Sequence, residues 1–118
     1  MSHRSYDHDG AERLIPLLRV LDREIRERGE AVAAAERALR ALRRNAELSP
    51  RERRIREGYL HAEISNHKRE LRQVNRELAR LGCLVDDGDP STVHIPGEDG
   101  DHGRGFVWRA GEAEIHEV

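Results

Sequence analysis

The residues best suited to chemistry lie near the end of the chain, around its only tryptophan. Trp108 and Arg109 precede Glu112, and His94 and His116 stand on either side of this segment. Imidazole and carboxylate groups ligate metals and transfer protons, and an indole with a guanidinium can hold a small ligand. These five residues therefore form the candidate site for a ligand or a protein partner.

The same segment has a structural interpretation, which the residues favour. Phe106 and Trp108 stand two positions apart and would share one face of a strand, where their bulk would fasten a small sheet to helices. Arg109 and Glu112 bracket Ala110-Gly111, a predicted tight turn across which the two charges would pair.

Other chemical motifs are weak. The segment from Asp87 to Glu98 has acidic residues at calcium-loop positions, but Thr92 stands where that loop needs glycine. Glu63 and His67 are four positions apart, whereas bundle metal sites use Glu and His three apart, so ordinary surface pairing explains them too. A metal near His67 stays open as an alternative. We assign no catalytic residue, no metal ligand and no cofactor.

The elements that must position these residues begin with two heptad seams, which are typical of paired helices. Each seam has one polar interruption, at Arg28 in the first and at His67 in the second. The first seam is Leu14, Leu18, Leu21, Ile25, Arg28, Val32, Ala35, Leu39, Leu42 and Ala46, and the second is Leu60, Ile64, His67, Leu71, Val74, Leu78 and Leu81.

The segment between the seams predicts a turn and a new helix. Ser49 is a good N-cap, Pro50 fits the first helical position, and Glu52 completes a capping box. Gly82 follows the last seam residue and is the usual helix stop. The chain therefore predicts helices over residues 7–46 and 49–81, packed as an antiparallel coiled-coil hairpin, with a kink near Pro16.

A turn at Ser49 and Pro50 pairs residues whose numbers sum to about 99. Arg28 and His67 then fall in adjacent layers of the seam. A polar layer costs stability but can fix register and oligomeric state. Alternatively, Arg28 reaches the edge of the seam to pair with Glu24 or Glu70.

The remaining residues, 83–118, predict a small antiparallel β region. Short β-branched and aromatic segments alternate there with turn-forming glycine, proline and aspartate. The expected strands cover residues 83–85, 92–95, 105–110 and 113–118. The whole is a mostly α fold of one domain, residues 1–118.

The composition of the chain limits the classes of partner that it can bind. Charged residues make up 37% of the 118 residues with a net charge of -2, so no uncompensated basic surface is available for nucleic acid. No apolar run reaches the roughly 20 residues that span a bilayer, so we expect no membrane insertion. The single Cys83 and the polar start MSHRSYDHDG favour a cytoplasmic location.

Two helices joined along one seam leave apolar flanks uncovered, at Leu17, Val20, Ala31, Ala34, Ala38, Ile55 and Tyr59. The small residues of AVAAAERALRAL would let further helices approach closely. The sequence thus predicts a homo-oligomer, a dimer forming a four-helix bundle. The alternative is that the C-terminal region folds back over the flanks.

The segments AERLIPLL, LGCLVDDGD, VHIP and VWRAGE together resemble the bacterial family catalogued as domain of unknown function 2203. The resemblance spans most of the chain. Members typically carry Leu-Cys-Trp before the W-R-x-G-E motif and Trp-His after it. Here Phe106 and Val107 replace the first two of these residues, and Ile115 precedes His116. The resemblance implies an architecture rather than an activity.

Two functions follow as hypotheses. The first is a non-enzymatic scaffold or adaptor, whose hairpin self-associates and whose sheet or helix face meets a protein partner. The second is a small ligand-binding or metal-assisted enzyme with a pocket between the β region and the hairpin, lined by His94, Trp108, Arg109, Glu112 and His116.

Overall fold

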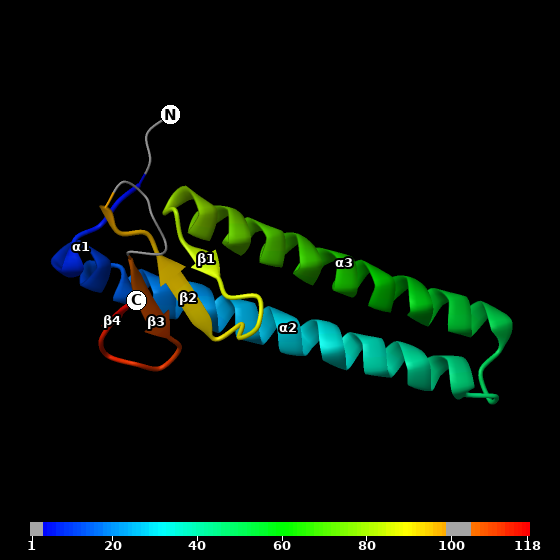
Figure 1. The fold of residues 1–118 in the computed structure, drawn as a ribbon. Helices are drawn as coiled ribbons and strands as arrows, with labels where there is room; N and C mark the ends of the chain where they lie inside the picture. Colours follow the sequence, from blue (N-terminus) through cyan, green and yellow to red (C-terminus); the bar gives the residue numbers. More distant parts are fainter. Residues whose placement is uncertain (1–3, 99–104) are drawn as a thin grey trace. The chain divides into compact units, whose positions relative to one another are not determined.

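A computed structural model describes residues 4–98 and 105–118 of the chain (Figure 1). The predicted β region includes residues 99–104, which lie outside the described part. In these described residues, three helices precede four strands: α1 (His8–Arg13), α2 (Ile15–Arg44), α3 (Pro50–Arg80), β1 (Leu84–Val85), β2 (Thr92–Ile95), β3 (Phe106–Arg109) and β4 (His116–Glu117). No described helix has an apolar stretch long enough to cross a lipid bilayer.

The predicted first helix is divided in two, because α1 ends at Arg13 and α2 begins at Ile15. The break falls beside Pro16, whose ring nitrogen has no hydrogen to donate to the preceding turn. Helical bonding resumes when the Leu18 amide donates to the Leu14 carbonyl at 2.8 Å. Asp7 caps α1 by accepting the Gly10 amide at 2.7 Å. The helix pair thus begins at Ile15.

Both ends of α3 follow the predicted capping chemistry. The Ser49 hydroxyl accepts the Glu52 amide at 3.2 Å, and Pro50 is the first helical residue. At the other end Gly82 has φ of 78°, its amide donates to Ala79, and the Cys83 amide donates to Leu78. This pair of bonds is a Schellman motif, which needs a left-handed residue and so favours glycine.

Turn formation ends α2 slightly earlier than predicted, at Arg44. The Asn45 side chain accepts the Glu47 amide at 3.0 Å, and the Asn45 carbonyl accepts the Arg53 guanidinium at 2.6 Å. Because Asn side chains compete for local backbone groups, the chain leaves the helix here rather than at residue 46.

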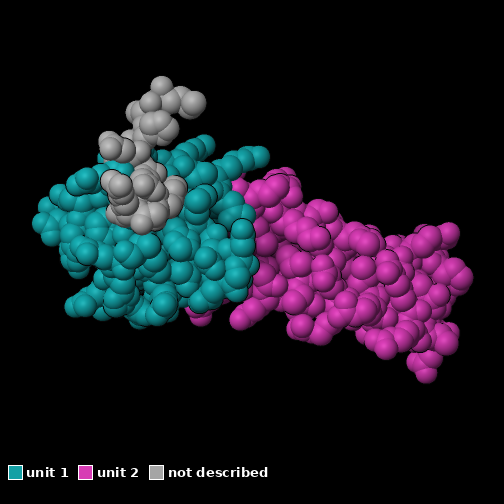
Figure 2. All heavy atoms as spheres, in the orientation of Figure 1, with its two compact units in different colours: residues 1–23, 74–118 teal, residues 24–73 magenta. Residues whose placement is uncertain are grey.

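The chain forms two compact units, one from the described parts of residues 1–23 and 74–118, the other from residues 24–73 (Figure 2). In the second unit α2 packs on α3, and every seam position from Ile25 to Leu42 and from Leu60 to Leu71 is buried or half-buried. In the first unit Leu18, Val74 and Leu78 are buried. The helical hairpin is therefore confirmed, whereas its supercoiling and its assembly into oligomers stay predictions.

The sheet is an antiparallel meander in the order β1-β2-β3-β4. Its inner face holds the alternating residues Val93, Ile95, Phe106 and Trp108, all at most 8% exposed. The Tyr6 amide donates to the Pro96 carbonyl at 3.2 Å, and the Tyr6 hydroxyl donates to the Leu81 carbonyl at 2.9 Å. Tyr6 thus ties the start of the chain to the end of α3 and the end of β2.

Candidate functional site

The outer face of the sheet carries one row of side chains that crosses all four strands. Leu84 lies opposite His94, His94 opposite Val107, and Val107 opposite His116. Directly opposed residues share a face of a sheet, so the four side chains stand side by side. His94 and His116 are two strand spacings apart, which is about 10 Å.

Each histidine of this row is paired with a carboxylate. His94 Nε2 lies 2.9 Å from Asp86 Oδ1, and His116 Nε2 lies 2.6 Å from Glu112 Oε2. The ring nitrogen of each histidine that does not face the carboxylate is Nδ1. The outer face therefore presents two separate imidazole–carboxylate pairs rather than one cluster.

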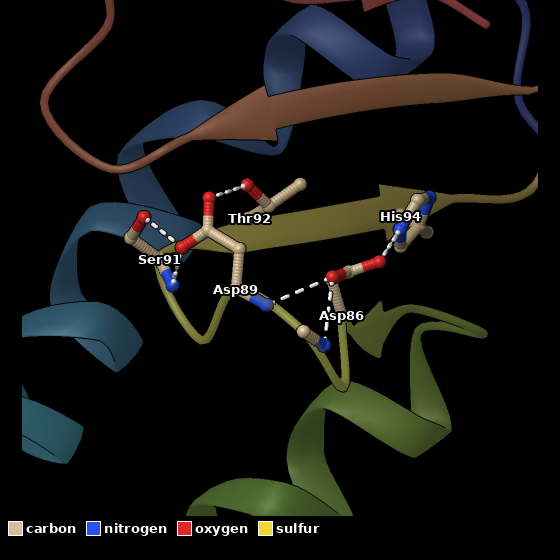
Figure 3. A network of polar contacts seen from close by, with 6 residues as sticks. Asp86, Asp89, Ser91, Thr92 and His94 are labelled. Atoms are coloured by element: carbon tan, nitrogen blue, oxygen red, sulfur yellow. Dashed lines mark hydrogen bonds and ion pairs between the residues drawn. The ribbon is translucent and has the colours of Figure 1, made fainter.

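Asp86 anchors the loop between β1 and β2. Its Oδ2 accepts the amides of Gly88 and Asp89 at 3.0 and 2.9 Å, while its other oxygen meets His94 (Figure 3). Asp89 in turn accepts the hydroxyls of Ser91 and Thr92 at 2.6 and 2.8 Å. Because the two carboxylates bond to the loop and to Thr92 and His94 of β2, this acidic segment is an ordered turn.

The same bonds set the acidity of the two carboxyl groups. The hydrogen bond from His94 is the main reason that the pKa of Asp86 is lowered, and the Asp89 and Gly88 amides add to it. The hydrogen bonds from Ser91 and Thr92 lower the pKa of Asp89, and the charge of Arg109 acts in the same direction. Both groups thus stay ionised in the folded protein to lower pH than usual.

Trp108 faces the other way. Its side chain is 0% exposed, and its Nε1 donates to the Glu112 carbonyl at 2.9 Å. Arg19 of α2 donates to the same carbonyl at 3.5 Å. The indole is therefore a core residue that also holds the turn after β3, as its structural interpretation predicts.

The turn between Arg109 and Glu112 forms as expected, since the Glu112 amide donates to the Arg109 carbonyl at 3.0 Å and Gly111 has φ of 90°. The Glu112 carboxylate pairs with His116, whereas Arg109 is exposed beside Asp89. The five predicted site residues thus divide into a buried indole, two imidazole–carboxylate positions and an exposed guanidinium. Within the described residues, Trp108 lies on the inner face of the sheet, whereas His94 and His116 lie on its outer face.

Arg28 and His67 form the polar layer of the hairpin. The Arg28 guanidinium donates to His67 Nδ1 at 3.0 Å and to Glu24 Oε1 at 2.9 Å, and the Glu24 bond is the first cause of its raised pKa. Since Nδ1 accepts, the His67 proton lies on Nε2, which faces Glu63 Oε1 at 3.8 Å. Contact across the seam agrees with the predicted adjacent layers, and Arg28 also bonds to Glu24, one of its two expected acidic partners.

A cavity of about 670 Å³ lies at one end of the sheet within the first unit. Its wall includes three carboxylates, those of Asp7, Glu98 and Glu117, together with the rings of His8 and Phe106, which meet edge to face. Glycines at positions 10, 97 and 105 also line it. Sequence reasoning missed the cavity because these residues come from four separate segments.

One small cluster in the described residues could hold a metal ion. The ligand atoms of His8, Asp9 and Glu12 lie within 4.8 Å of one another, and all three side chains are exposed. The signal in the sequence is the spacing along one helical turn. His8 and Glu12 also form an ordinary i,i+4 ion pair at 3.8 Å, which explains the arrangement without a metal.

A second concave surface lies at the turn end of the hairpin, wholly within residues 24–73. This tip groove, of about 510 Å³, is lined by Ala38, Ala41, Leu42, Asn45, Arg56, Tyr59 and Leu60. Tyr59 is 75% exposed and the neighbouring Ile55 is 50% exposed. Large apolar side chains are thus open to solvent at a groove that is lined in part by alanines.

Comparison with known proteins assigns the chain to one family. The model of the family described as uncharacterized conserved protein, DUF2203, matches residues 4–118, so the chain belongs to that family. No curated protein and no solved structure matches it. The family confirms the resemblance carried by the sequence segments and assigns no activity.

Proposed function

We propose that this member of the DUF2203 family is a non-enzymatic scaffold, whose helical hairpin associates with further copies of the chain. The observation that carries the proposal is the apolar surface left open on the hairpin, above all Tyr59 at 75% and Ile55 at 50% exposed. Removing apolar surface from water favours association by about 25 cal/mol per Å². A cytoplasmic location belongs to the same proposal.

Small residues on α2 support close packing of a second helix pair. Ala31, Ala34, Ala38 and Ala41 are spaced by three and four positions and so follow one side of the helix. Ala34, Ala38 and Ala41 are exposed. With side chains this short, two helices can approach to about 8 Å between axes, which increases their dispersion contacts.

The outer face of the sheet is the surface we assign to a protein partner. Leu84 is 53% exposed and stands beside His94 in the cross-strand row. An exposed leucine next to paired imidazoles offers both apolar area and hydrogen-bonding groups, the mixture common in protein interfaces. In a scaffold, self-association through the hairpin would then array several copies of this face.

Sedimentation velocity over a range of concentrations tests the proposal. We expect the sedimentation coefficient to rise with concentration as monomers associate. A chain that stays monomeric up to about 1 mM, where binding of only about -4 kcal/mol would be seen, contradicts it.

The second candidate is a small ligand-binding or metal-assisted enzyme, and the cavity at the end of the sheet favours it. A volume of about 670 Å³ lies within the range of small-molecule sites. The described residues that line the cavity include the carboxylates of Asp7, Glu98 and Glu117 and no lysine or arginine, which would suit a cationic ligand. Metal analysis of untagged protein separates the candidates: stoichiometric metal supports this one, and a metal-free assembly supports the scaffold.

A further inference from the structure

The tip groove and Tyr59 lie on one face of the hairpin, because Tyr59 is one of the residues that line the groove. Ala38 and Ala41 line the groove from α2, and Tyr59 lines it from α3 with 75% of the residue exposed. A tyrosine ring brings roughly 150 to 250 Å² of surface to a contact. One face of the hairpin thus carries both a projection and a hollow.

Projection and hollow also lie at the same level along the hairpin. The ion pair between Arg43 and Glu57, at 3.8 Å, marks positions on α2 and α3 that face each other across the tip. Counting two positions further from the turn on each helix brings Ala41 level with Tyr59. Ala38 lies about one helical turn further along α2.

We infer that the tip groove receives the Tyr59 ring of a second copy of this chain, while its own Tyr59 enters the groove of that copy. The symmetry axis runs parallel to the hairpin, so α2 of each copy packs on α3 of the other. This inference rests on the proposed self-association and specifies its geometry.

A twofold axis can relate two facing hairpins in two ways, and the position of each residue along the hairpin distinguishes them. An axis parallel to the helices keeps every residue at its own level and exchanges α2 with α3, so each ring meets alanines. An axis across the helices sets α3 against α3 and reverses the levels, so each Tyr59 ring faces α3 of the other copy and not the alanines of α2. Only the first arrangement places the Tyr59 ring of each copy in the tip groove of the other.

Affinity measurements on matched variants test the role of the ring. Tyr59→Ala removes both ring contacts of the dimer, and at about tenfold each the Kd should rise about 100-fold. Val20→Ala is the matched control, because Val20 is 60% exposed and lies outside the groove. An equal change in Kd for both variants, or no change for Tyr59→Ala, overturns the inference.

Disulfide trapping tests the arrangement. In a Cys83→Ser background, one chain carries Ala41→Cys and another carries Tyr59→Cys, and the two are mixed before mild oxidation. Cysteines bond only when their Cα atoms are about 4.4 to 6.8 Å apart, so we expect the mixed disulfide to exceed either homodisulfide.

The outcomes separate this inference from the function on which it rests. Dimers in sedimentation with a dominant bond between two copies of Cys at position 59 overturn the arrangement and leave self-association standing. A chain that is monomeric at every concentration overturns both. A dominant mixed disulfide in a dimer supports both.

Discussion

The two compact units differ in how completely they bury their apolar residues. In residues 24–73 only Ala35, Leu39 and Leu42 are buried, all from α2, and none is below 4% exposed. In the other unit Trp108 and Ile95 are 0% exposed, and buried residues come from helices and strands alike. A pair of helices covers only one side of each, whereas helices and a sheet together enclose a core.

This difference shows which unit buries its apolar side chains and which leaves them exposed to solvent. The unit with the sheet encloses its own core, and many of its polar groups form hydrogen bonds in helix caps and turns. The hairpin tip instead leaves its largest side chains in water, and its seam contains a polar layer. We therefore expect substitutions in the first unit to change the stability of a single chain, and substitutions at the tip to change association.

The largest effect on stability should come from Trp108→Ala. The indole is fully buried and bonded to the Glu112 carbonyl, so its removal leaves a cavity and takes away one of the two donors to that carbonyl. We expect the free energy of unfolding to fall by about 3 to 5 kcal/mol in urea denaturation. A loss below about 1 kcal/mol would show that the sheet does not depend on this residue.

The double variant Arg28→Leu with His67→Leu tests what the polar layer contributes to the hairpin. Replacing the polar layer by apolar side chains should raise the melting temperature, because the guanidinium and the imidazole need no longer be partly desolvated. The register they specify should loosen at the same time. Calorimetry with sedimentation velocity measures both, and a higher melting temperature with an unchanged size distribution contradicts the register role.

Tyr6→Phe removes one hydroxyl and keeps the ring. The lost bond to the Leu81 carbonyl should lower the free energy of unfolding by about 0.5 to 1.5 kcal/mol. Tyr59→Phe is the matched control, because the Tyr59 side chain is mostly in solvent and should lose almost nothing in the monomer. If the free energy of unfolding falls equally for the two variants in dilute solution, the bond from the Tyr6 hydroxyl does not stabilise the fold.

The smallest effect is a dependence of stability on acid pH. The folded state lowers the pKa of Asp86 and Asp89 below their ordinary value of 3.8, so both carboxylates stabilise the fold fully above that value. This contribution is lost as the pH falls through the lowered pKa values. Asp86→Asn should therefore lose less urea resistance than the native protein when the pH falls below 3.8, with Asp87→Asn measured beside it as a variant that removes the same charge from the same loop. Identical pH profiles for native protein and Asp86→Asn would contradict the role of the His94 bond.

Much of the fold is readable from local chemistry. Gly82 stops α3, Ser49 and Pro50 start it, and the seams face inward where the heptads predict. These features depend on a few neighbouring residues. The division of the first helix was predicted only as a kink at Pro16, because sequence shows a missing donor but not whether tertiary contacts restore the helix.

The candidate site was less predictable, because it depends on strand register. Trp108 and Arg109 are neighbours in sequence yet lie on opposite faces of β3, and His94 joins His116 in one row only through the pairing of both with Val107. A shift of one residue would reverse every face. Sequence order alone does not supply that pairing, so the five residues were assigned to one pocket.

The central claim is that the hairpin tip is completed by a second copy of the chain. Hydrogen exchange of the amides in residues 24–44 and 50–73, measured at low and high protein concentration, tests it most directly. We predict that protection there increases with concentration while protection in β2 and β3 stays the same. Exchange at the tip that does not depend on concentration would contradict the claim.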